Sequence, residues 1–228
     1  MTIEAILTDI EGTVGSIRFV KEVLFPYADQ QMETFLTRHW NDPAVASAVA
    51  DAAGDSGEIL DDPASAAALL RRWIAEDRKA TPLKTLQGLI WRAGYENGDY
   101  RAHVYPDAVE GLRRWHRDGL ALYVYSSGSI AAQKLFFGHS EAGDLTPLFN
   151  GYFDTTSGGK KEADSYRAIQ AEIGVAPQAI LFLSDVEAEL DAARAAGLHT
   201  VLLDRDDAIA DSDHRRVTTF DDIAPGAL

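Results

Sequence analysis

Residues 3–13 read Ile-Glu-Ala-Ile-Leu-Thr-Asp-Ile-Glu-Gly-Thr, a short apolar run that stops at a polar cluster containing glycine. The apolar part, Ile3 to Thr8, is typical of a buried strand, and the cluster after it is typical of the turn that ends a strand. Two carboxylates, Asp9 and Glu11, therefore follow the first predicted strand directly. The pattern in the rest of the chain indicates the kind of sheet to which this strand belongs.

After residue 100 the sequence alternates between short apolar runs and amphipathic stretches of about ten residues. Strands are predicted at 120–125, 151–154, 179–183 and 200–203, and helices at 107–118, 129–137, 161–173 and 187–196. Such alternation is typical of right-handed βαβ units and of a Rossmann-like parallel sheet with helices on both faces. We expect an α/β fold, with Asp107 and Glu110 forming a capping box at the start of the first of these helices.

The segment between the first strand and residue 100 has a different sequence pattern, with no predicted strand. Helix-forming runs from about residue 19 to 97 are separated by Asp42-Pro43, Asp62-Pro63 and Thr81-Pro82, where a capping side chain is followed by a first-turn proline. We therefore expect an all-helical domain at residues 15–100, inserted into a core domain made of residues 1–14 and 101–228.

The composition excludes several classes of protein. The chain has 228 residues and no cysteine, and 36 acidic against 21 basic residues give it a net charge of −15. It can therefore form no disulfide framework and no thiolate nucleophile, and its charge disfavours nucleic acid and anionic membranes as partners. The N-terminus has no basic and apolar leader, and no run approaches the ~20 apolar residues of a membrane span. We expect a cytoplasmic protein.

Polar clusters follow four of the predicted strands, at the edge where parallel α/β sheets bind ligands. They are Asp9 with Glu11, then Ser126-Ser127-Gly128, then Lys160-Lys161, and finally Ser184-Asp185. Three carboxylates suit Mg²⁺, whereas serines at the start of a helix suit a phosphate. A lysine offsets the charge of an anionic substrate and an anionic nucleophile. Together these groups indicate phosphoryl transfer to an aspartate.

These clusters resemble the four motifs of the haloacid dehalogenase (HAD) superfamily. Asp9-Ile10-Glu11-Gly12-Thr13 is similar to the first motif, Ser126 to Ser129 to the second, Lys160 to the third, and Ser184-Asp185-x-x-x-Glu189 to the fourth. Superfamily phosphatases usually have a second Asp where this chain has Glu11. The resemblance therefore implies a HAD-like core, in which residues 15–100 are the helical cap domain.

Longer strings resemble one family within that superfamily, the enolase-phosphatases of methionine salvage. They are Phe19-Val20-Lys21, Leu24-Phe25-Pro26-Tyr27, Tyr123 to Ser129, Gln133-Lys134-Leu135, Phe137 to Ser140, and Glu162 with Ser165 to Arg167. This resemblance implies a Mg²⁺-dependent acireductone synthase. Such an enzyme enolises 2,3-diketo-5-methylthiopentyl-1-phosphate and then removes the phosphate, which gives 1,2-dihydroxy-3-keto-5-methylthiopentene.

The resemblance also implies roles for individual residues. Asp9 takes the position of the nucleophile and binds metal, Glu11 binds metal through its carbonyl, and Asp185 is the third metal ligand. Ser126 and Ser127 bind the substrate phosphate, and Lys160 binds substrate. Asp9, Glu11 and Lys160 form the expected catalytic set, in a monomer that acts on a small phosphorylated diketone.

Several alternatives stay open. Lys161 competes with Lys160, which we favour because it fits a Gly-x-Lys-x-Glu register ending at Glu162. The Glu11 side chain could protonate a leaving group or take part in enolisation. Glu189 has the motif spacing and is expected to lie behind the ligands, whereas Glu187 is expected to be solvated. The alternative function is a HAD-family phosphatase or phosphomutase that acts on another small phosphorylated metabolite.

Overall fold

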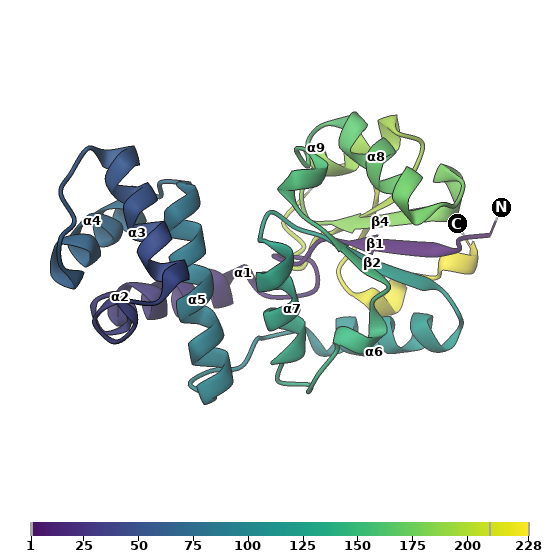
Figure 1. The fold of residues 1–228 in the computed structure, drawn as a ribbon. Coiled ribbons are helices and arrows are strands. Elements are labelled where there is room, and N and C mark those ends of the chain that lie inside the picture. The colour runs from purple at the N-terminus through teal and green to yellow at the C-terminus, as the bar shows by residue number, and fades with distance from the viewer. Residues whose placement is uncertain (1, 210, 228) are drawn as a thin grey trace. The chain divides into compact units, whose positions relative to one another are not determined.

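The computed structural model of the chain describes residues 2–209 and 211–227 (Figure 1). The chain forms two compact units, one made of residues 1–17 and 101–228 and the other of residues 18–100. Each unit has a hydrophobic core of its own.

The first unit is built on a six-stranded sheet with the strand order β3-β2-β1-β4-β5-β6. The strands are β1 (Ala5–Thr8), β2 (Ala121–Tyr125), β3 (Gly151–Phe153), β4 (Ile180–Ser184), β5 (His199–Leu203) and β6 (Arg215–Val217). Every neighbouring pair is parallel, so the predicted α/β class is confirmed. The sequence did not predict β6, because its three residues include two exposed arginines.

The register aligns the ends of the three central strands. Thr8, the last residue of β1, lies opposite Val124 on one side and Leu183 on the other. The residues that follow these positions therefore emerge at the same edge of the sheet. This alignment places the polar clusters after β1, β2 and β4 beside one another.

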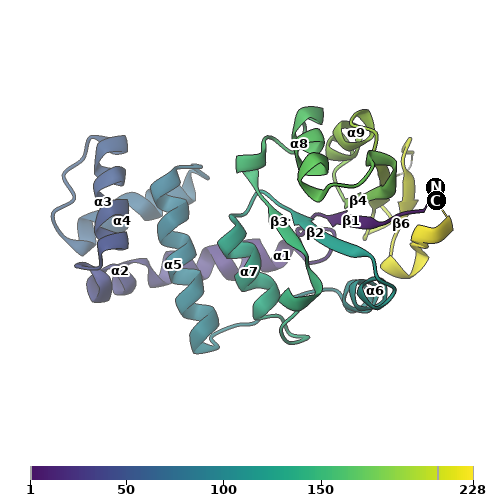
Figure 2. The ribbon, with the colours of Figure 1, turned by 45° about the vertical axis from the view of Figure 1, so that its right-hand side comes forward.

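Four helices cover the sheet, namely α6 (Pro106–Arg117), α7 (Ile130–Gly138), α8 (Ala163–Ile173) and α9 (Glu187–Ala195). Figures 1 and 2 show α8 and α9 together on one face of the central strands and α6 on the other. Short 3₁₀ turns occur at Thr146–Leu148, Thr155–Ser157, Pro177–Ala179, Phe220–Asp222 and Pro225–Ala227. In α6, Val109, Leu112 and Trp115 recur at helical spacing and are buried, which seats this helix on the sheet.

The predicted capping box between Asp107 and Glu110 is wrong. The helix begins at Pro106, whose fixed φ suits a first helical position, and no side chain caps it. The Oδ2 of Asp107 instead accepts hydrogen bonds from Arg205 Nη1 at 2.5 Å and from the Phe220 N–H at 2.8 Å. The carboxylate therefore connects distant parts of the chain instead of stabilising the end of its own helix.

The second unit is entirely helical over residues 18–100. After α1 (Ile17–Phe19) and a π-helical turn (Val20–Leu24) come α2 (Phe25–His39), α3 (Pro43–Ser56), α4 (Pro63–Ala75) and α5 (Thr81–Asn97). Asp42 and Asp62 cap α3 and α4, and each precedes a first-turn proline as the sequence predicts. The predicted cap at Thr81 is wrong, because Thr81 is the first residue of α5 and no side chain caps that helix. Trp73, Leu70 and Leu86 are fully buried in its core. Among the described residues, no helix has the length and apolar character needed to cross a membrane.

Candidate active site

The loop after β1 is a tight turn that carries Asp9 and Glu11. The Asp9 N–H still donates to the Leu183 carbonyl at 2.9 Å, so Asp9 is fixed to the end of the sheet. The carbonyl of Ile10 then accepts hydrogen bonds from the N–H groups of residues 13, 14 and 15. Because the backbone satisfies its own polar groups, the loop has one defined shape.

Gly12 brings this loop against Asp185 at the end of β4. Its φ of +78° is a conformation that favours glycine, and a Cβ at this position would lie 2.1 Å from Oδ2 of Asp185. Only a residue without a side chain therefore allows Asp185 to approach the first loop so closely.

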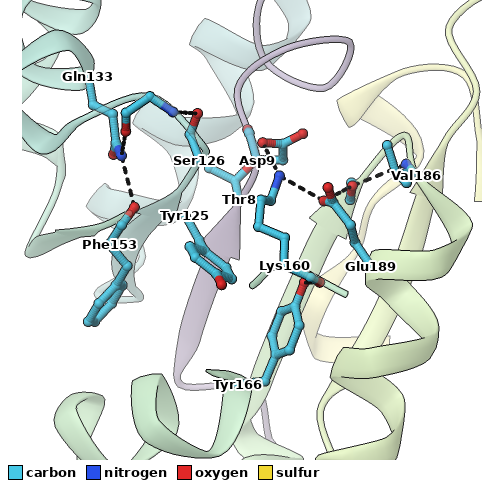
Figure 3. Close-up of polar contacts among 12 residues, drawn as sticks. Thr8, Asp9, Tyr125, Ser126, Gln133, Phe153, Lys160, Tyr166, Val186 and Glu189 are labelled. Atoms are coloured by element: carbon cyan, nitrogen blue, oxygen red, sulfur yellow. Dashed lines mark hydrogen bonds and ion pairs between the residues drawn. The ribbon is translucent and has the colours of Figure 1, made fainter. Parts of the chain in front are cut away.

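Lys160 joins two buried carboxylates (Figure 3). Its Nζ lies 2.6 Å from Oδ1 of Asp9 and 2.7 Å from Oε2 of Glu189, and all three side chains are close to fully buried. Asp9 follows β1, Glu189 lies in the first turn of α9, and Lys160 precedes α8. Three segments that are distant in sequence thus converge on one ammonium group.

Ser184 fixes the position of Glu189. Its hydroxyl donates to Oε2 of Glu189 at 2.9 Å and accepts from the Val186 N–H at 3.1 Å. Glu189 therefore has two donors on the same carboxylate oxygen, one charged and one neutral, and its side chain is held in a single orientation.

The site carries excess negative charge. Asp9, Asp185 and Glu189 contribute three carboxylates, against the single ammonium of Lys160. Burial, and after it the charge of Asp9, raises the pKa of Asp185 to about 7, and the same two causes raise the pKa of Glu189. Burial alone would lower the pKa of Lys160, but the charges of Asp9 and Glu189 outweigh it and raise that pKa. The ammonium therefore stays protonated.

The donor set fits a divalent cation. Oδ1 of Asp185 is buried and has no hydrogen-bond partner among the described residues, so this oxygen lacks the compensation that a buried carboxylate needs. Within residues 2–209 and 211–227, no three acidic or histidine side chains gather as a metal site. A cation held by Asp9 and Asp185 would thus need backbone, water or substrate oxygens as its other ligands, a mixture that Mg²⁺ accepts.

The loop after β2 presents Ser126 beside the start of α7. Ser126 is buried, and its hydroxyl oxygen accepts from the Gly128 N–H at 3.2 Å. Gln133 then anchors the loop, because its amide nitrogen donates to the carbonyls of Gly128 and Phe153, both at 2.8 Å. Ser127 is exposed in the same loop, and Ser129 caps α7.

Of the site residues predicted from the sequence, Asp9, Lys160 and Asp185 lie close enough in the structure to interact. Asp9 and Lys160 are in direct contact, and Asp185 interacts with both through charge. Glu11 is half-buried in the turn beside Asp9. Lys161, the competing lysine, is exposed, so Lys160 is the one that enters the site.

Sequence reasoning missed several residues that shape the site. It placed Glu189 behind the ligands but did not predict its contact with Lys160. It also gave no role to Tyr125 or Tyr166, whose hydroxyls donate to the backbone carbonyls of Gly158 and Lys160. Two signals could have marked these tyrosines: their nearness in sequence to Ser126 and Lys160, and their place in the strings that resemble the enolase-phosphatases.

Comparisons with known proteins give the family. The model of haloacid dehalogenase-like hydrolases matches residues 3–197. The enolase-phosphatase E1 of Alcanivorax borkumensis is 61% identical, over 97% of this chain and 98% of that protein. The enolase-phosphatase E1 of Pseudomonas aeruginosa is 57% identical, over 98% of this chain and 99% of that one. The chain belongs to the enolase-phosphatase family of haloacid dehalogenase-like hydrolases.

Solved structures agree with this membership. The crystal structure of the UTR4 protein of Saccharomyces cerevisiae is 35% identical, with a TM-score of 0.83 over 97% of this chain and 100% of that one. CbbY of Rhodobacter sphaeroides, solved with phosphate, is 18% identical with a TM-score of 0.62 over 99% of this chain and 100% of that one, so it shows a shared fold.

The predicted resemblance and the predicted enzyme class are confirmed. As a member of the enolase-phosphatase family, the chain is an enzyme of the phosphatase class of hydrolases. Enolase-phosphatases and the other phosphatases of the superfamily are generally metal-dependent, which agrees with the unpartnered oxygen of Asp185.

Proposed function

We propose that this enolase-phosphatase is a Mg²⁺-dependent acireductone synthase of methionine salvage. It enolises 2,3-diketo-5-methylthiopentyl-1-phosphate and then hydrolyses the phosphate ester of the enol. The observation that carries the proposal is the Lys160 ammonium between Asp9 and Glu189, at the strand ends of a chain that is 61% identical to an enolase-phosphatase.

Mg²⁺ is the proposed metal. The carboxylates of Asp9 and Asp185, together with the carbonyl of Glu11, would hold it, and waters or substrate oxygens would complete the shell. When bound, the ion polarises a phosphoryl or carbonyl oxygen and neutralises charge that develops on it. Support comes from the net negative charge of the site and from the buried, unpartnered Oδ1 of Asp185.

Asp9 is the proposed nucleophile. Its carboxylate attacks the phosphorus of the enol phosphate, a new P–O bond to Asp9 forms, and the ester P–O bond breaks with the electron pair passing to the enol oxygen. Water then cleaves the aspartyl phosphate, which releases inorganic phosphate and restores the carboxylate. Burial of Asp9 and its fixed backbone support this role, because they hold the oxygen in one place.

The phosphate is proposed to bind between the loop after β2 and Lys160. Ser126 and Ser127 supply hydroxyl donors near the N-terminal end of α7, where the helix dipole favours an anion. Lys160 adds a positive charge that is maintained by its two carboxylate partners. These donors would be in place before substrate arrives, because Gln133 and the strand ends fix the loops that carry them.

Enolisation needs a proton to leave the carbon beside a carbonyl and a proton to reach the carbonyl oxygen. Glu11 is the proposed group for this transfer, through its side chain, because it replaces the superfamily's usual second aspartate in the turn next to Asp9. The predicted helical domain of residues 15–100 is the proposed cap, whose function is to exclude water from a reactive enol. We propose a cytoplasmic monomer with a small-molecule substrate.

A coupled assay tests the proposal. The diketo phosphate is incubated with enzyme in Mg²⁺ or in a chelator, while the ultraviolet absorbance of the enol and the release of phosphate are followed together. We expect the enol to appear and then phosphate, with both lost in chelator and phosphate release lost in Asp9→Asn. If another small phosphate ester is hydrolysed and the diketo phosphate is not, the chain has the alternative function within its superfamily.

A further inference from the structure

Three consecutive backbone carbonyls around Lys160 are each held by a different hydroxyl group. The carbonyl of Gly158 accepts from the Tyr125 hydroxyl at 2.9 Å, that of Gly159 from the Ser165 hydroxyl at 2.8 Å, and that of Lys160 from the Tyr166 hydroxyl at 2.7 Å. Neighbouring carbonyls in a loop usually point in different directions, so three separate donors are needed to hold all of them. We call Tyr125, Ser165 and Tyr166 the hydroxyl clamp.

The clamp hydroxyls come from rigid parts of the core. Tyr125 is the last residue of β2, and Tyr166 lies in the first turns of α8. Their rings pack edge to face with centroids 5.5 Å apart, and Tyr166 packs in the same way on Phe182 of β4 at 5.1 Å. Both tyrosines are completely buried, and burial raises the pKa of each, so each phenol keeps the proton that it donates.

The glycines of the loop suit this arrangement. Gly158 has a φ of +117°, and a Cβ on it would lie 2.2 Å from the hydroxyl oxygen of Ser165. The loop can approach the clamp this closely only because that side chain is missing. Ser165 is itself buried, so its hydroxyl cannot move aside into solvent.

The clamp also lies next to the functional end of Lys160. The Nζ of Lys160 is 5.9 Å from the centroid of the Tyr125 ring, which therefore contacts the lysine as well as holding Gly158. Since a lysine side chain has many rotamers, its ammonium is placed reproducibly only if its backbone is fixed as well.

We propose that Tyr125, Ser165 and Tyr166 are positioning residues of the reaction, which act by fixing the backbone of Lys160 so that its ammonium meets Asp9 and the substrate phosphate. None of the three is required to touch substrate. The inference rests on the role proposed above for Lys160.

The test is a double-mutant cycle between Tyr166→Phe and Lys160→Ala. Tyr166→Phe removes one hydroxyl and keeps the ring, and we expect it to lower kcat about threefold to tenfold, the effect of losing one hydrogen bond to a group that must be well placed. In the Lys160→Ala background the same change should leave kcat unaltered, because its effect passes through the lysine. A purely structural tyrosine would lower activity by the same factor in both backgrounds.

Ser165→Ala and Ser140→Ala provide a matched pair. Both serines are buried in the same unit and donate to a glycine carbonyl, Ser165 to Gly159 at 2.8 Å and Ser140 to Gly143 at 2.6 Å. We expect only Ser165→Ala to lower kcat, although thermal unfolding should show a similar loss of stability in both. Equal kcat values for the two variants would overturn the proposal.

A binding measurement covers the case in which Lys160→Ala turns over too slowly for kinetics. The dissociation constant of inorganic phosphate with Mg²⁺ is determined by calorimetry for the same four proteins of the cycle. Tyr166→Phe should weaken phosphate binding only when Lys160 is present, and weakening in both backgrounds contradicts the clamp. All kinetic measurements are repeated with p-nitrophenyl phosphate, so a wrong substrate assignment would abolish turnover of the diketo phosphate alone and leave the test of the clamp intact.

Discussion

Oε2 of Glu189 and Nζ of Lys160 lie 2.7 Å apart, and the same ammonium lies 2.6 Å from Asp9. The proposed nucleophile, in the loop after β1, thus shares its counter-ion with a second carboxylate, which belongs to α9. Because Glu189 is also held by Ser184, it gives the lysine a second carboxylate partner of fixed position. We therefore expect the ion pair with Glu189 to determine how tightly Lys160 pairs with Asp9 and how well its ammonium can also bind the substrate phosphate.

Glu189→Gln is expected to lower kcat about tenfold or more, since the neutral amide holds the ammonium less strongly and Lys160 then pairs more tightly with Asp9. The measurement is steady-state phosphate release with kcat and KM determined separately. Glu187→Gln is the matched control, because Glu187 lies in the same helical turn but is exposed. A Glu189→Gln enzyme with the kcat of the wild type would show that this ion pair has no part in the reaction.

Substitution of the two adjacent lysines should have very different effects. Lys160→Ala removes the ammonium partner of the buried carboxylates of Asp9 and Glu189 and also removes a proposed phosphate ligand, so we expect kcat/KM to fall by about 10³-fold. Lys161→Ala should stay within about twofold of the wild type, because that side chain is exposed. Circular dichroism on both variants checks that they are folded. A larger loss in Lys161→Ala would reverse the assignment of the two residues.

Mg²⁺ should stabilise the folded protein independently of catalysis. A cation at Asp9 and Asp185 relieves the repulsion between their buried charges, and at a Mg²⁺ concentration of 100 times Kd we expect about 2.7 kcal/mol of stabilisation. Thermal unfolding with increasing Mg²⁺ measures this as a rise in Tm. Asp185→Asn should remove most of the rise, whereas Glu187→Gln, two residues away and exposed, should keep it. An identical rise in Asp185→Asn would place the ion elsewhere.

The convergence of Asp9, Lys160 and Asp185 could be predicted from sequence because one rule suffices: polar residues that follow parallel strands meet at one edge. The contact of Glu189 with Lys160 could not be predicted from the sequence. The helical pattern places Glu189 in the first turn of α9, but the pairing of two long side chains depends on how α8 and α9 pack on the sheet. Asp107 shows the same limit. Its spacing to Glu110 predicted a helix cap, but its carboxylate accepts hydrogen bonds from Arg205 and Phe220, which are distant in sequence.

Asp107 gives a prediction about acid stability. Burial alone would raise the pKa of its carboxyl, but the Phe220 N–H and Arg205 outweigh burial and hold that pKa below its ordinary value of 3.8. A depressed pKa in the folded state means that the stabilisation is complete above the unfolded pKa and is lost as the pH falls through the folded one. Asp107→Asn should therefore lower the free energy of unfolding by about 2 kcal/mol at neutral pH.

Urea unfolding at several pH values checks this. The difference in free energy of unfolding between the wild type and Asp107→Asn should be constant from about pH 7 to pH 5 and should shrink below about pH 4. Asp118→Asn is the control at the other end of α6, where an exposed carboxylate should change stability by less than about 0.5 kcal/mol. A difference that persists undiminished at the lowest pH would mean that Asp107 stabilises the fold by packing and not through its charge.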